Sequence, residues 1–110
     1  MSTTMIGTLI EDPTIFKTEA GNTNATFVIK MERTNGHKFL TTHLECRTMG
    51  PLAENIGISL HSGDRVIVFG TISQGGEWNS DPEASGILLN LTAVGPDLLG
   101  QRAIWQKVES

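Results

Sequence analysis

Residues 24–48, NATFVIKMERTNGHKFLTTHLECRT, decide the fold of this chain. Apolar and polar residues alternate in the first half of this stretch, so that Phe27, Ile29 and Met31 share one face. A period of two with β-branched and aromatic residues is typical of a half-buried strand. Asn35-Gly36 follows, and because both residues accept a positive φ, this pair is among the strongest short hairpin signals. The stretch therefore predicts a β-hairpin with one face in a hydrophobic core.

The return strand is expected over residues 38–48. Its core face would hold Leu40, Leu44 and Cys46, and we interpret the lone cysteine as a small core residue. The residues expected on the outer face are Phe39, Thr41, His43, Glu45 and Arg47. The strand is thus predicted to present a mixed aromatic and charged surface to solvent.

Shorter β-type runs continue on both sides of the hairpin. Strands are predicted over 4–11, 65–73 and 87–95, and the first is expected to stop at Pro13, which cannot donate to a ladder. A short helix is predicted from Pro51, because proline suits a first helical position and three apolar residues recur at helical spacing: Leu52, Ile56 and Leu60. Phe16 is expected in a turn after Pro13.

Three strands, a helix and two strands predict an all-β fold of the oligonucleotide-binding (OB) class. This is a five-stranded Greek-key barrel with one short helix between strands 3 and 4. A strand–strand–helix sandwich is a weaker alternative. At 110 residues the chain is the size of one domain, and we expect residues 1–110 to form it, with 98–110 as a C-terminal arm or an extra strand.

Composition indicates a protein of the cytoplasm. One cysteine cannot form an internal disulfide, no apolar run is long enough to span a membrane, and no signal peptide is visible. The net charge of −4 is unusual for a nucleic-acid-binding protein, but it is unevenly distributed. Residues 74–97 carry four acidic and no basic residues, whereas the hairpin carries half of the eight basic residues: Lys30, Arg33, Lys38 and Arg47. Lys30 and Arg33 fall on opposite strand faces unless the sheet bends.

Four stretches, in order along the chain, resemble the bacterial single-stranded DNA-binding protein family. They are an opening strand that ends in Asp12-Pro13, a helix start, a Gly-Asp-containing strand, and a tryptophan in the loop that follows it: residues 6–13, 49–55, 62–70 and Glu77-Trp78. The closing residues 93–98, with Arg102 and Trp105, resemble short members of that family. Each motif alone is weak, whereas the ordered set is specific. The resemblance implies an OB-fold, a homotetramer or sometimes a dimer, and binding of single-stranded DNA with little sequence preference.

Four positions depart from the family pattern. His43 and Met49 stand where aromatic residues are frequent, Glu77 replaces a common cation beside Trp78, and Pro51 replaces a frequent lysine. The family's acidic tail, which recruits repair and replication enzymes, has no counterpart in this sequence, so that role is not supported. These departures favour a second reading, in which the chain is an OB-fold interaction or assembly module with weak or lost nucleic-acid affinity.

The candidate DNA-binding residues combine flat side chains, which stack on unpaired bases, with cations, which neutralise phosphates. They are Trp78, His43, Met49, Phe39, Arg47, Lys38, Lys30 and Arg33. Trp105 is expected to pack against a neighbouring subunit. No catalytic motif, cofactor or metal site is expected, because the histidines and Cys46 lack metal-site spacing. Replication, recombination or repair at the nucleoid would be the setting.

Overall fold

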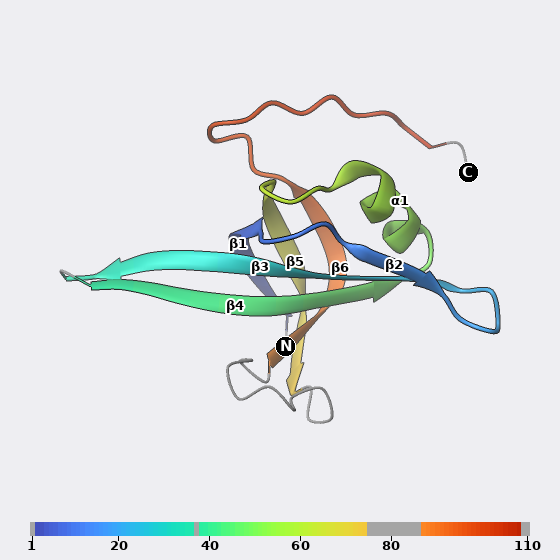
Figure 1. Ribbon diagram of the computed structural model, residues 1–110, viewed down its shortest axis with the longest axis horizontal. Helices are drawn as coiled ribbons and strands as arrows, with labels where there is room; N and C mark the ends of the chain where they lie inside the picture. Colours follow the sequence, from blue (N-terminus) through green and yellow to red (C-terminus); the bar gives the residue numbers. More distant parts are fainter. Residues whose placement is uncertain (1, 37, 75–86, 109–110) are drawn as a thin grey trace.

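The computed structural model describes residues 2–36, 38–74 and 87–108, without the side chains of residues 33–35, 38–40 and 74. Within these ranges the elements are β1 (Ser2–Leu9), β2 (Thr14–Lys17), β3 (Thr23–Asn35), β4 (Lys38–Met49), α1 (Pro51–Ser59), β5 (Arg65–Gln74) and β6 (Ile87–Pro96). The strands pair in the order β1-β5-β6-β4-β3-β2, and β1 also pairs with β3. That last pairing closes five strands into a barrel and leaves β2 outside it (Figure 1). The expected five-stranded OB barrel is confirmed.

The hairpin predicted from residues 24–48 is the longest feature of the fold. β3 and β4 pair without a break from Asn24↔Met49 to Asn35↔Lys38, and they extend beyond the barrel as a two-stranded ribbon (Figure 1). Gly36 has a φ of 68° at the turn, but Asn35 does not have a positive φ and pairs with Lys38 as the last residue of β3, so the turn begins one residue later than the Asn-Gly signal predicts. The hairpin therefore carries its outer face well past the core.

The core lies inside the barrel and under α1. Phe27, Ile29, Leu44 and Cys46 are each at most 3% exposed, as the alternation predicts. Burial raises the pKa of the Cys46 thiol to about 12, so it stays protonated and inert at neutral pH. The helix adds Ala53 and Ile56 to the core, with Leu52 and Leu60 packed against it.

Two details of the first strand region were predicted wrongly. β1 ends at Leu9 rather than at residue 11, and residues 14–17 form the edge strand β2 instead of the turn expected for Phe16. Pro13 does interrupt the ladder, but the chain resumes pairing with β3 directly afterwards, from Thr14↔Thr26 to Lys17↔Thr23. Four residues are too few for a clear period-two signal, so the sequence did not indicate this strand. It forms because β3 provides a partner for its backbone hydrogen bonds. The helix consequently follows the fourth strand of the chain, which is the third strand of the barrel.

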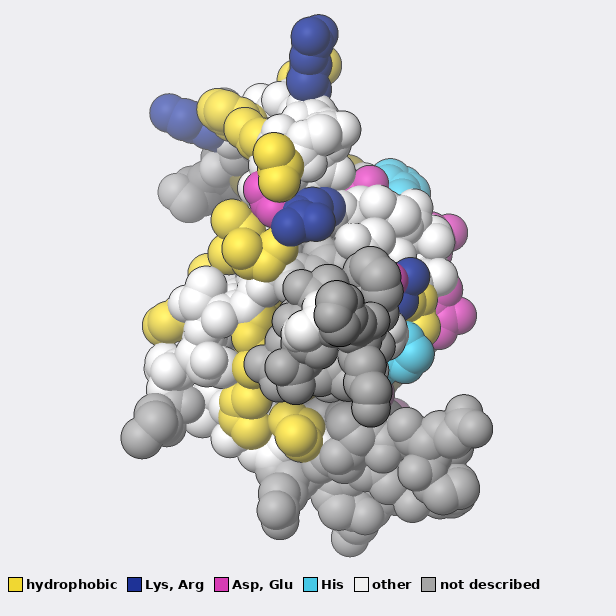
Figure 2. Space-filling model, turned by 90° about the vertical axis from the view of Figure 1, so that its left-hand side faces the viewer, with side chains coloured by type: hydrophobic (Ala, Val, Ile, Leu, Met, Phe, Trp, Pro, Cys, Tyr) yellow, Lys and Arg dark blue, Asp and Glu magenta, His cyan; other side chains and the backbone are white. Residues whose placement is uncertain are grey.

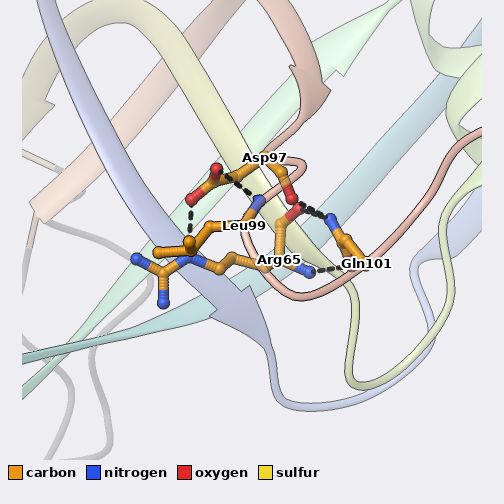
Figure 3. Close-up of polar contacts among 4 residues, drawn as sticks. All are labelled: Arg65, Asp97, Leu99 and Gln101. Carbon is orange, nitrogen blue, oxygen red and sulfur yellow. Dashed lines mark hydrogen bonds and ion pairs between the residues drawn. The ribbon is translucent and has the colours of Figure 1, made fainter.

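Residues 97–108 form neither helix nor strand and run as an arm past α1 (Figure 1). Its base is tied to the start of β5: Arg65 Nε donates to Asp97 Oδ2 at 2.5 Å, and Gln101 Nε2 donates to the Arg65 carbonyl at 2.6 Å (Figure 3). The hydrogen bond from Arg65, helped by the Leu99 amide, lowers the pKa of Asp97, so the carboxylate stays charged at neutral pH. Beyond this anchor, Trp105 is 76% exposed.

Candidate nucleic-acid interface

The outer face of the β3–β4 hairpin gathers four of the predicted site residues. Directly opposite residues of an antiparallel pair point to the same side of the sheet, and the register joins Lys30 to His43. Arg47 and Met49 follow along β4 on the same side, because the intervening Leu44 and Cys46 face the core. His43 and Met49 are exposed, and Lys30 and Arg47 are half-buried. We call this surface the hairpin face.

The neighbouring strands widen the hairpin face on both sides. Arg47 pairs with Asn90 of β6 on one side and with Thr26 of β3 on the other. Asn90 Nδ2 donates to Ser73 Oγ at 3.1 Å, which holds the amide across the β5–β6 pair. Thr14 of β2 pairs with Thr26, so this row crosses four strands. The result is a continuous, mostly polar surface with a cation near its middle.

The other four predicted DNA-binding residues have no described side chain, so only the strand positions of three of them can be compared with the hairpin face. Arg33 pairs with Leu40, and Lys38 pairs with Asn35, so along their strands both alternate out of phase with Lys30 and His43. The position of Phe39 alternates in phase with His43. The side chains of these three residues, and Trp78 as a whole, lie outside the described part of the chain.

The charges on the hairpin face nearly balance. Lys30 Nζ lies 3.2 Å from Glu32 Oε1, with both side chains about half exposed, so this ion pair contributes at most about 1 kcal/mol. Glu45 lies between His43 and Arg47 on β4, on the same side of the sheet. Two cations are therefore accompanied by two carboxylates, and the face has less positive potential than phosphate binding alone would require.

A different surface, formed by β1 and β5, is apolar. Ile6 pairs with Ile67, Phe69 lies two residues further along β5, and all three are 38–46% exposed. They point outward, because their neighbours Val66 and Val68 are fully buried. Figure 2 looks at the hairpin end of the molecule: hydrophobic side chains run down one flank, and most acidic and histidine side chains lie on the other. The two outer surfaces thus differ in chemistry.

Sequence reasoning missed the residues that neighbouring strands add to the hairpin face. Asn90 and Thr26 flank Arg47 only because β6 and β3 pair with β4, and Phe16 joins through β2. The β-branched and aromatic residues of the run Thr14-Ile15-Phe16 after Pro13 were the one signal that could have indicated the edge strand. The register between strands that are distant in sequence leaves no pattern within either strand from which it could be predicted.

The described ranges contain neither a candidate metal site nor a candidate membrane-spanning helix. No group of three histidine, cysteine or acidic side chains among them could hold a metal ion. None of the helices in these ranges is long and apolar enough to cross a membrane.

Comparison with known proteins agrees with this architecture. The profile of the single-strand binding protein family matches residues 1–91. A small single-stranded DNA-binding protein from Streptomyces coelicolor superposes with a TM-score of 0.78 at 19% identity, over 94% of this chain and 97% of that one. The second single-stranded DNA-binding protein of Mycobacterium smegmatis gives 0.71 at 25% identity, over 97% and 98% of the two chains. The Thermus aquaticus protein gives 0.70 at 21%, over 90% of this chain and 51% of that one.

No curated protein matches the chain in sequence. The family profile covers most of the chain, and the five-stranded barrel is the fold shared with these structures. The chain therefore belongs to the single-strand binding protein family, whose members bind DNA without catalysing a reaction on it.

Proposed function

We propose that this protein binds single-stranded DNA along the hairpin face, with little sequence preference. The observation that carries the proposal is the row of His43, Arg47 and Met49 on one side of β4, joined by Lys30 across the register. Unpaired bases expose flat faces that stack on rings, and phosphates pair with cations. The half-buried Arg47 supplies a cation between an imidazole and a thioether that can lie against bases.

The near balance of charge on this face determines how much of the DNA affinity comes from phosphate contacts and how much from base contacts. Because Glu32 and Glu45 offset Lys30 and Arg47, counterion release contributes less than on a basic surface. Base contacts then carry a larger share, and we assign the strongest of them to Trp78, whose neighbours in the sequence, Glu77 and Asn79, are both polar. Stacking on one aromatic ring is worth about 1–3 kcal/mol per base.

A titration with dT oligomers at low and high salt tests the proposal. We expect binding that weakens with salt and quenches tryptophan fluorescence, and Trp78→Ala should weaken binding by about fivefold or more. Trp105→Ala leaves Trp78 as the sole tryptophan, so quenching that persists in this variant comes from Trp78. If the protein bound no dT at low salt, the second reading, an OB-fold interaction module, would be favoured.

We also propose that the protein is a homo-oligomer, with a tetramer favoured over a dimer. The apolar surface of Ile6, Ile67 and Phe69 supports self-association, because a contiguous exposed apolar patch marks an interaction surface. Trp105 on the arm is the second candidate contact with a neighbouring subunit. Light scattering should give four times the mass of one chain, and the mass of a single chain would contradict this proposal.

The cellular setting is also part of the proposal. A sequence-tolerant binder of single strands serves replication, recombination or repair, where duplex DNA is opened. We place it at the nucleoid in the cytoplasm, in agreement with the cysteine usage.

A further inference from the structure

The edge strand β2 holds Phe16 on the same side of the sheet as the hairpin face. Ile15 packs on the helix: a Cβ added at Gly57 of α1 would lie 2.9 Å from Ile15 Cγ1. Successive side chains of a strand point to opposite sides, so Phe16 points away from α1. It is 49% exposed, in contact with solvent rather than with the core.

The register places Phe16 at one end of a row that crosses three strands. Phe16 pairs with Asn24, and Asn24 pairs with Met49 of β4. The Gly50 amide donates to the Thr23 carbonyl at 2.8 Å, which continues the β3–β4 pairing past this row and fixes it at the start of α1. Neighbouring strands lie about 4.8 Å apart, so the backbones that carry Phe16 and Met49 are separated by roughly 10 Å.

The three side chains of this row differ in height above the sheet. Asn24 is only 8% exposed, whereas Phe16 and Met49 stand out at 49% and 64%. The row therefore has an amide at its floor and an aromatic ring and a thioether at its sides. Arg47 lies two residues from Met49 on the same side of β4, so a cation borders the row.

We propose that Phe16 and Met49 hold one base of the bound single strand, with the Asn24 amide at the edge of that base. This inference rests on the proposed function and names a binding subsite within it. The ring of Phe16 supplies the flat surface that Met49 lacks, and Arg47 lies where the phosphate of the same nucleotide can reach it. DNA is favoured over a protein partner here because the row is continuous with the hairpin face and adjoins its half-buried cation.

Substitutions at Phe16 test this subsite by their effect on dT-oligomer affinity, measured by anisotropy of labelled DNA. Phe16→Ala should weaken binding about fivefold or more, and Phe16→Leu should weaken it similarly, because leucine keeps apolar bulk but has no ring. Phe16→Trp should bind as well as the unsubstituted protein or better. Ile58→Ala is the matched control: Ile58 is an apolar residue of α1, 78% exposed and outside the row, and its loss should change affinity by less than about twofold.

Photocrosslinking of the unsubstituted protein gives a second, independent measurement. An oligomer containing 5-iodouracil should crosslink to the peptide that carries Phe16, identified by mass spectrometry. Binding by Phe16→Leu at full affinity would show that the ring is not used and would overturn the subsite, as would a crosslink map without this peptide. If the unsubstituted protein bound no dT, the proposed function would fall and the subsite with it, whereas full binding by Phe16→Ala overturns the subsite alone.

Discussion

Replacing Gly70 with alanine should lower the free energy of unfolding by about 3 kcal/mol or more. A Cβ at this position of β5 would collide with the carbonyl oxygen of Asn90 and lie 3.0 Å from the Leu91 Cα, both backbone atoms of β6. The register explains the contact, because it passes from Phe69↔Ala93 to Gly70↔Leu91 and leaves Thr92 as an extra residue. Such a bulge bends the strand, and here the bend brings β6 directly against Gly70.

Gly95 on β6 provides the matched control for this substitution. A Cβ there meets no atom within 4 Å, and Gly95 does not have a positive φ. Gly95→Ala should therefore change stability by less than about 0.5 kcal/mol. Urea unfolding followed by circular dichroism measures both variants. Equal stability of the two alanine variants would contradict the view that Gly70 is required by close backbone approach.

Replacing Arg47 with glutamine should weaken dT binding about tenfold or more. A charge-assisted hydrogen bond contributes about 1.5–3 kcal/mol, and Arg47 is the cation nearest the middle of the hairpin face. The same variant should reduce the slope of log affinity against log salt by about 0.7, the value for one phosphate contact on a single strand. Titrations at several salt concentrations give both quantities.

Glu45 gives a control of opposite sign, two residues away on the same side of β4. Glu45→Gln removes a carboxylate that repels phosphates, so this variant should bind dT more tightly than the unsubstituted protein, most clearly at low salt. If both glutamine variants bound with unchanged affinity, DNA would not follow this face. If only Arg47→Gln were unchanged, the contacts would be made through bases rather than phosphates.

The contrast between β3–β4 and β2 shows how far local sequence extends. The hairpin and its core face could be anticipated, because alternation and a turn signal act within one continuous stretch, whereas the register that pairs Asn35 with Lys38 differs from the one that an Asn35-Gly36 turn would set. Phe16 was assigned to a turn, because a four-residue edge strand carries almost no periodic signal and depends on β3 for its hydrogen bonds. Local patterns predict elements of eight residues or more far better than short edge strands, which form only because a longer strand provides their hydrogen-bond partners.

The candidate site divides in the same way. His43 and Arg47 were placed on one face by the period of two within the predicted strand, and Met49 joins them because β4 continues to this residue. Lys30 joined them through the register of the same hairpin. The positions of Asn90, Thr26 and Phe16 beside β4 depend on pairing between strands that lie tens of residues apart in the sequence. No short-range pattern encodes such pairing.

The sequence by itself determined the hairpin, the core alternation, the helix after Pro51 and the order of elements that predicts a five-stranded barrel. Only the tertiary structure decided the β1–β3 closure, the bulge that presses β6 against Gly70, and the neighbours of Arg47. The physical reason is that side-chain alternation and turn chemistry act over a few residues, whereas strand pairing and close backbone approach depend on where distant segments meet.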